Sequence, residues 1–129
     1  MASWNLLGYI GGMQTFSFKI PGNPVPKERP RVTNAHTYTP QRTLKAEKAI
    51  QAYALQARVK PLVGDLIVEI WFFRDNQRRC DIDNLAKLVL DSLNKVAWRD
   101  DTQIIDLLLY KRYDRENPRT EITITVANS

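Results

Sequence analysis

Residues 66–113 read "LIVEIWFFRDNQRRCDIDNLAKLVLDSLNKVAWRDDTQIIDLLLYKRY" and decide the fold. Leu66–Phe73 is β-branched and aromatic almost throughout, which predicts a central strand. After a polar loop, apolar residues recur at helical spacing between positions 84 and 96, which predicts a helix with one face on the core. That face consists of Leu85, Leu88, Val89, Leu93 and Val96. Residues 102–113 then predict a second strand.

Two further strands are expected outside this stretch. Met13–Ile20 and Arg119–Val126 alternate apolar and polar residues, which is typical of strands with one buried face. Between them, the segment Pro21–Arg31 contains four prolines. Proline lacks a backbone donor and fixes its φ angle, so this segment is expected to be an extended loop.

A second helix is expected from Pro40 to about Val59, with Thr39 as its N-cap. Its apolar face would be supplied by Leu44, Ala46, Ile50, Tyr53, Ala54 and Ala57. The resulting order, β-α-β-α-β-β, predicts an α+β domain with a mixed sheet and helices on one face.

The chain of 129 residues is expected to form one domain over residues 13–129, preceded by a flexible leader at residues 1–12. No apolar run approaches the roughly 20 residues of a membrane span, so no membrane association is expected. Cys80 is the single cysteine of the sequence and cannot form an intrachain disulfide, which favours a reducing, cytoplasmic location.

The net charge of +5 and its distribution favour a polyanionic partner, nucleic acid above all. Residues 19–60 carry nine Lys or Arg and two acids, whereas six of the fourteen acids lie between Asp75 and Asp101. We expect phosphate contacts from a basic row in the extended loop, from one face of the first helix and from the loop after Arg74. These residues are Lys27, Arg29, Arg31, Arg42, Lys45, Lys48, Arg78 and Arg79. His36 is interpreted as a loop residue rather than a phosphate contact.

The Asp81-Ile82-Asp83 stretch stands where the polar loop meets the second predicted helix. Aspartates are favoured at helix N-termini, so capping explains one of the two without any function. Two carboxylates on one side of an extended segment repel each other unless a divalent cation with oxygen ligands lies between them. Lys87 follows Asp83 by four residues and shares its helix face. It forms either a weak ion pair with Asp83 or an ammonium that stabilises charge on a phosphate.

A metal site would need a third carboxylate. Asp91 lies eight residues after Asp83, about 12 Å along the helix axis, too far to join the same ion. Asp91 is instead expected to pair with Lys87 or Lys95, or to face an interface. Asp100 and Asp101 follow the helix, where the chain can return toward its start, and spacing alone does not separate these two.

The motifs in this region resemble the signature of the RusA family of Holliday-junction resolvases. The pattern D-x-D-N-x-x-K (residues 81–87), then D-x-L (91–93), then D-D-x-Q (100–103) carries the resemblance. "IPGNPVPKERPRVT" and "YTPQRT" also look like the N-terminal part of RusA-like endonucleases, especially those of phages and prophages. The sequence departs from the family at Cys80 and in a segment before Asp100 that is about one residue shorter.

The resemblance implies a homodimeric, Mg²⁺-dependent endodeoxyribonuclease, with Mn²⁺ as a substitute, that cuts four-way DNA junctions by paired symmetric nicks during recombination and repair. It implies Asp81, Asp83 and Asp101 as metal ligands, with Asp100 as the alternative, and Lys87 as a catalytic residue. The expected location is the cytoplasm, at the nucleoid. A nuclease for another branched, single-stranded or RNA substrate and a non-enzymatic nucleic-acid-binding module are the alternatives.

Overall fold

The computed structural model of the chain describes residues 5–10, 13–34 and 36–127. Its main elements follow the predicted order: β2 (Met13–Pro21), α1 (Gln41–Gln56), β5 (Leu66–Arg74), α2 (Ile82–Leu93), β6 (Ile104–Tyr113) and β7 (Arg119–Val126). Three short strands and a 3-10 turn are added: β1 (Asn5–Ile10), β3 (Arg31–Val32), β4 (Thr37–Tyr38) and η1 (Asp101–Gln103). The prediction of an α+β fold is confirmed.

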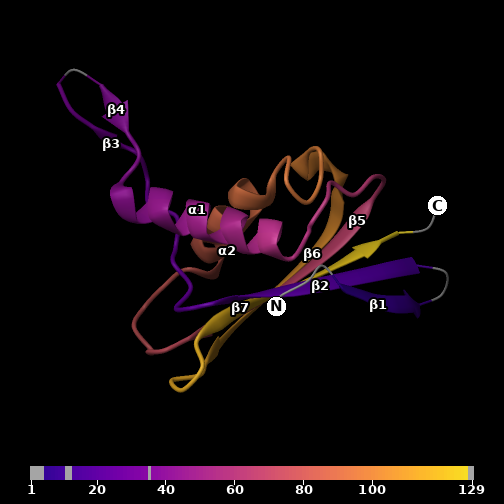
Figure 1. The fold of residues 1–129 in the computed structure, drawn as a ribbon. Helices are drawn as coiled ribbons and strands as arrows, with labels where there is room; N and C mark the ends of the chain where they lie inside the picture. The colour runs from indigo at the N-terminus through magenta and orange to yellow at the C-terminus, as the bar shows by residue number, and fades with distance from the viewer. Residues whose placement is uncertain (1–4, 11–12, 35, 128–129) are drawn as a thin grey trace.

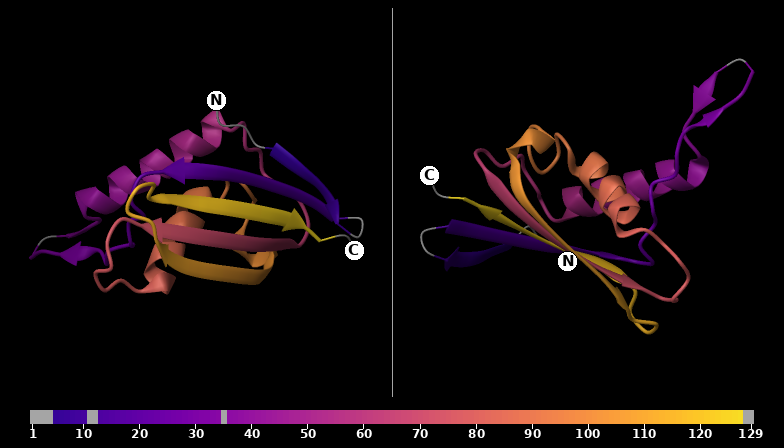
Figure 2. Two further views of the ribbon diagram at one scale, coloured as in Figure 1. Left: turned by 90° about the horizontal axis from the view of Figure 1, so that it is seen from below. Right: turned by 180° about the vertical axis from the view of Figure 1, so that it is seen from behind.

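One mixed sheet has the strand order β1-β2-β7-β5-β6 (Figure 1 and Figure 2, left). The pairs β1–β2, β2–β7 and β7–β5 are antiparallel, whereas β5 and β6 are parallel. A parallel neighbour requires a crossover, and α2 supplies it between β5 and β6. Consequently α2 begins just beyond the carboxyl end of β5, and η1 leads back into the amino end of β6.

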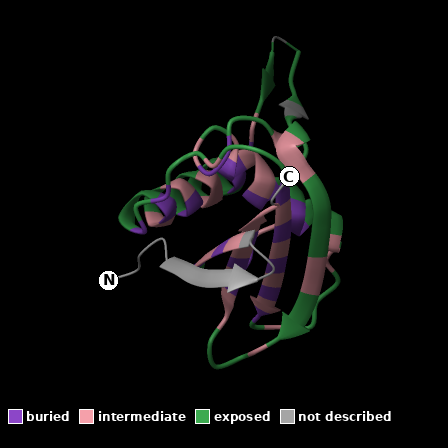
Figure 3. Ribbon diagram, turned by 90° about the vertical axis from the view of Figure 1, so that its right-hand side faces the viewer, coloured by how far each residue is buried: buried purple, intermediate pink, exposed green. Residues whose placement is uncertain are grey.

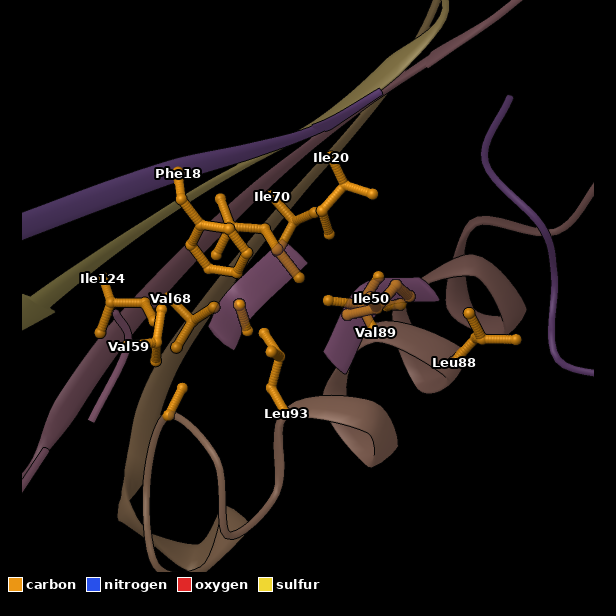
Figure 4. Packing of buried hydrophobic residues seen from close by; sticks show 14 of the residues in the cluster. Phe18, Ile20, Ile50, Val59, Val68, Ile70, Leu88, Val89, Leu93 and Ile124 are labelled. Carbon is orange, nitrogen blue, oxygen red and sulfur yellow. The ribbon is translucent and has the colours of Figure 1, made fainter. Parts of the chain in front are cut away.

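Both helices cover the same face of the sheet, as predicted (Figure 1 and Figure 2, right). Along β5 the burial alternates strictly, with Leu66, Val68, Ile70 and Phe72 facing the helices. Figure 4 shows side chains from β2, β5, β7 and both helices packed into one cluster between the layers. The predicted core positions Leu85, Leu88, Val89 and Leu93 are buried, and Val96 packs against the cluster.

The segment before α1 forms a small hairpin that projects from the body of the molecule (Figure 1). Its strands β3 and β4 pair Arg31 with Tyr38 and Val32 with Thr37. The described side chains of the hairpin are exposed (Figure 3). His36 lies in the turn of the hairpin, and its backbone N–H donates to the Thr33 hydroxyl at 3.2 Å. This agrees with the interpretation of His36 as a loop residue.

The ends of α1 differ slightly from the prediction. The helix begins at Gln41, and its N-cap is Pro40 rather than Thr39. It ends at Gln56 instead of near Val59, because Arg58 adopts a left-handed φ of 60° that cannot continue the helix. Within the predicted apolar face, Ile50, Ala54 and Ala57 are buried, whereas Leu44 is exposed.

The predicted flexible leader at residues 1–12 does not describe positions 5–10, which form β1 at the edge of the sheet. Positions 1–4 and 11–12 lie outside the described residues. The sequence signal for a hairpin was available, since a Gly-Gly pair separates two apolar segments at this point. None of the helices in the described part of the chain is long and apolar enough to cross a membrane.

Candidate active site

Asp81 and Asp83 lie at the amino end of α2, where the loop after β5 turns onto the helix. Asp81 is the N-cap residue in an extended conformation, yet its side chain makes no capping hydrogen bond. Asp83 lies in the first turn, and its Oδ1 accepts from the Asn84 backbone N–H at 3.0 Å. Both are exposed, and no described residue forms an ion pair with either carboxylate. Capping by side chains therefore does not account for the pair.

Asp100 and Asp101 have different surroundings although they are adjacent. Asp100 caps η1: its Oδ2 accepts from the Thr102 N–H at 3.3 Å and from the Thr102 hydroxyl. These hydrogen bonds hold the pKa of Asp100 below its ordinary value. The Gln103 side chain completes the box by accepting from the Asp100 N–H at 3.0 Å. Asp100 is thus occupied in shaping the turn.

Asp101 accepts one hydrogen bond through Oδ1, from the indole N–H of Trp98 at 2.7 Å. Trp98 is fully buried, so the donor that restrains the Asp101 carboxylate is itself held in place by the core. Asp101 lines a pocket of about 250 Å³ together with Asp83 and Lys87. The remaining lining residues are Ala86, Leu90, Asp91, Leu107 and Leu109. The structure thus brings Asp83, Lys87 and Asp101 to one pocket from two separate elements.

Asp81 is placed differently from its two predicted partners. It lines two neighbouring pockets, of about 540 and 360 Å³, rather than the pocket of Asp83 and Asp101. Among the residues that the structure describes, no three acidic, histidine or cysteine side chains are placed to hold a metal ion together. The donor chemistry, carboxylate oxygens only, fits Mg²⁺, and two of the three predicted ligands share a pocket.

Lys87 does not pair with Asp83 in the structure. Its Nζ lies 3.8 Å from Asp91 Oδ2, one helical turn further on, and its side chain is largely exposed. The expected pairing of Asp91 with Lys87 is therefore confirmed. Asp91 also accepts from Lys27 Nζ at 2.7 Å, so it lies between two ammonium groups at the rim of the pocket.

Lys27 differs from the prediction that it belongs to a free basic row. Its Nζ donates to Asp91 and, at 3.2 Å, to Glu47, and its backbone N–H donates to the Asn84 carbonyl at 2.9 Å. Burial lowers the pKa of this ammonium, but the hydrogen bonds and charges of Asp91 and Glu47 outweigh it and raise the pKa above its ordinary value. Lys27 therefore ties the proline-rich loop to both helices, and its charge is already neutralised.

The contacts of the other predicted basic residues with phosphate stay predictions, and these residues differ in exposure and in their neighbours. Arg29, Lys45 and Lys48 are exposed and form no ion pair with a described residue. Arg42 is exposed and lies 3.9 Å from Glu28 Oε1, and the side chain of Arg31 lies outside the described residues. Arg78 and Arg79 are exposed in the loop that leads to Asp81.

Sequence reasoning missed two basic residues that contact this loop. Arg74, the last residue of β5, donates from Nη1 to the Arg78 carbonyl at 2.5 Å. Lys111 of β6 donates from Nζ to the Cys80 carbonyl at 2.5 Å. Both lie at positions that read as ordinary strand ends, and only the parallel pairing of β5 with β6 brings them together beside the loop.

Comparison with known proteins supports the motif-based resemblance. The sequence model of the family described as "Endodeoxyribonuclease RusA" matches residues 21–125. The chain is 41% identical over 51 residues to the crossover junction endodeoxyribonuclease RusA of Escherichia coli K12 and to that of Enterobacteria phage 82. Each of these matches covers 39% of the chain and 42% of the relative. YqaN of Bacillus subtilis 168 is 25% identical over 138 residues, covering 87% of the chain and 96% of the relative.

Proposed function

The chain belongs to the RusA family of endodeoxyribonucleases, and we propose that it is a Mg²⁺-dependent enzyme that resolves Holliday junctions by paired symmetric nicks in DNA. The relatives named crossover junction endodeoxyribonuclease, one of them from a phage, support this substrate. The observation that carries the proposal is the pocket shared by Asp83, Lys87 and Asp101, because α2 and η1 bring these residues together and they match the family pattern.

In the proposed mechanism, Asp81, Asp83 and Asp101 hold the metal. A Mg²⁺ ion held there would lower the pKa of a water and would stabilise the attacking and leaving oxygens of a phosphodiester. Asp83 and Asp101 orient the water at the pocket, since no histidine lies nearby among the described residues. The indole N–H of Trp98 donates to Oδ1 of Asp101 and so restrains the carboxylate beside the pocket that Asp101 lines.

Lys87 is proposed to stabilise negative charge on the scissile phosphate. Its ammonium is exposed, and its 3.8 Å separation from Asp91 is long for a hydrogen bond, so the contact restrains Lys87 without consuming its donors. The positive end of the α2 dipole lies beside Asp83 and favours an anion at the same place. Arg29, Lys45, Lys48, Arg78 and Arg79 are proposed to contact the DNA backbone outside this centre, at the junction arms.

Two nicks on opposing strands require two sites, and each chain carries one such pocket. We therefore propose a homodimer with two-fold symmetry, matching the approximate symmetry of a four-way junction. The edge strand β6 supports this arrangement, because Ile105, Leu107 and Leu108 are exposed on it and its outer edge pairs with no strand of the described residues.

The test is cleavage of labelled four-way junctions, flaps, single strands and duplexes with and without Mg²⁺. We expect Mg²⁺-dependent, paired nicks in the junction, and loss of cleavage with retained junction binding in Asp83→Asn. Asp65→Asn, an exposed aspartate in the loop before β5 and outside the pocket, is the matched control. If Asp83→Asn cut junctions as fast as the control, the assignment of the site would be wrong. Preferential cleavage of flaps or single strands would mean that these, and not four-way junctions, are the substrate. No cleavage of any of these DNAs would favour a non-enzymatic nucleic-acid-binding module.

A further inference from the structure

A second pocket, of about 540 Å³, lies between the loop after β5 and the carboxyl end of β6. Five basic residues line it against a single acid: Arg74, Arg78, Arg79, Lys111 and Arg112 against Asp81. They come from two neighbouring parallel strands and the connecting loop, so the fold and not one basic run in the sequence gathers the charge.

Arg74 is the most unusual member of this pocket because it is buried, with 9% of the residue exposed. Its Nη1 donates to the Arg78 carbonyl, but its Nε has no hydrogen-bond partner. No described carboxylate forms an ion pair with it. A buried charge without a counter-charge is costly, and one carbonyl dipole compensates it only in part. A buried guanidinium of this kind therefore favours the binding of an anion at this place.

Lys111 adds a second positive charge at the wall of the pocket. Its Nζ makes one hydrogen bond, to the Cys80 carbonyl, and an ammonium has three donors. Arg78 and Arg79 are exposed and unpaired with any described acid. Arg112 contributes less, because its guanidinium lies over the rings of Trp71 and Tyr110, at 5.1 and 5.7 Å from their centroids.

We propose that this pocket is an anion site that binds a phosphate group of the nucleic-acid backbone beside Asp81. Arg74 and Lys111 form the ordered side of the site, since each donates a hydrogen bond to a carbonyl of the loop. The exposed side chains of Arg78 and Arg79 supply further donors to the bound phosphate. The identity of the ligand as a DNA phosphate rests on the proposed function, whereas the anion site itself rests on the buried Arg74 and the surrounding charge.

A phosphate in this pocket would also position the catalytic segment. Arg74 and Lys111 hold the carbonyls of Arg78 and Cys80, and Asp81 follows directly in sequence. Binding at the pocket thus restrains the loop that carries Asp81, the predicted ligand that stands apart from Asp83 and Asp101. This links occupation of the site by a DNA strand to the assembly of the three carboxylates.

The test uses the double variant Arg79→Gln/Lys111→Gln, with Arg115→Gln/Lys60→Gln as a control of equal charge change outside the pocket. Inorganic phosphate is titrated by amide chemical shifts, and junction affinity is measured as a function of salt without Mg²⁺. We expect phosphate binding to weaken at least tenfold in the pocket variant alone. We also expect the slope of log affinity against log salt to fall by about 0.9 for each lost phosphate contact.

Equal phosphate binding and equal salt slopes in the two double variants would overturn the anion site. Weaker phosphate binding with an unchanged slope would overturn its assignment to the DNA backbone. If the wild type neither bound nor cut DNA while the pocket variant still lost phosphate, the proposed function would fail and the anion site would stand. Thermal unfolding of each variant shows whether the fold is retained.

Discussion

Two adjacent aspartates illustrate how the fold assigns tasks to single residues. Asp100 caps η1 through Thr102, while Gln103, the other half of that box, donates to the carbonyls of Leu62 and Gly64 at 3.0 and 2.9 Å. Asp101 instead faces the pocket, held by Trp98. A capping residue supports the fold, whereas a carboxylate that accepts one indole hydrogen bond and lines a pocket can bind a ligand.

This difference predicts opposite effects of two substitutions. Asp101→Asn should lose more activity than the roughly 10–100-fold typical of an outer-shell residue at a metal site, and its unfolding temperature should change little. Asp100→Ala should lower the unfolding temperature, because η1 loses its cap, and should keep most of the cleavage. Junction cleavage and thermal unfolding, measured side by side, check both. If Asp100→Ala lost more cleavage than Asp101→Asn, Asp100 and not Asp101 would be the metal ligand.

At the scale of elements, hydrophobic periodicity was enough to predict most of the fold. The strict alternation of β7 and the apolar face of α2 arise from burial on one side, and both are local sequence patterns. The parallel pairing of β5 with β6 could not be predicted, because it depends on which strands meet after the crossover. The same pairing places Arg74 and Lys111 beside the loop, so the sequence indicated Arg78 and Arg79 of the basic pocket but not these two residues.

The candidate site was predictable to a similar extent. The resemblance identified Asp83, Lys87 and Asp101, which share a pocket, but it could not show that Asp81 lines a different one. Reasoning from an extended chain placed Lys27, Arg29 and Arg31 in one row. That reasoning does not include contacts with other elements of the fold. In the structure, the half-buried ammonium of Lys27 forms ion pairs with the carboxylates of Asp91 and Glu47 instead of joining the row.

The proline-rich loop should therefore respond differently to substitution at two of its basic residues. Lys27→Gln leaves Asp91 and Glu47 without their shared cation and should destabilise the fold by about 1.5–3 kcal/mol, the range for hydrogen bonds to charged groups. Arg29→Gln removes an exposed charge and should lower DNA affinity with little change in stability. Urea unfolding and junction binding distinguish the two. A Lys27→Gln variant of unchanged stability would contradict this account.

The turn between β6 and β7 predicts a pH dependence of stability. Arg119 donates to Asp114 at 2.8 Å and to Glu121 at 2.5 Å, and its guanidinium lies 3.8 Å from the centroid of Phe73. The hydrogen bond from Arg119 is the main cause that lowers the pKa of Asp114. A lowered pKa in the folded state contributes stability above the unfolded pKa, near 3.8, and this contribution is lost as the pH falls through the folded value.

Asp114→Asn removes that titration. We expect the variant to be less stable than the wild type at neutral pH, and the difference to shrink below pH 3.8. Chemical denaturation over this pH range measures it. Asp65→Asn, an exposed aspartate outside any ion pair with a described residue, is the control and should show no such convergence. A difference that stays constant with pH would mean that the Asp114 charge does not act through Arg119.

At the scale of the whole molecule, the unpaired edge of β6 indicates where two copies of the chain would form a dimer. β6 is an edge strand of ten residues, and Ile105, Leu107 and Leu108 are 53%, 41% and 38% exposed. Exposed apolar edges readily pair with another strand. Antiparallel pairing of two β6 strands about a two-fold axis would continue the sheet and keep both helical layers on one side. Because Leu107 and Leu109 also line the carboxylate pocket, both pockets would flank the seam on that side.

This arrangement predicts that charge on the edge separates the copies. The double variant Ile105→Lys/Leu108→Lys should sediment as a monomer where the wild type sediments as a dimer, because two ammonium groups would have to be buried at the seam. Val63→Lys, at an apolar position 66% exposed in the loop before β5, should remain dimeric. The monomeric variant should then make single nicks in a junction instead of paired ones, since each site acts alone. Sedimentation velocity combined with a cruciform plasmid assay, which separates nicked from linear product, measures both effects. A dimeric edge variant, or paired nicking by a monomer, would place the interface or the source of symmetry elsewhere.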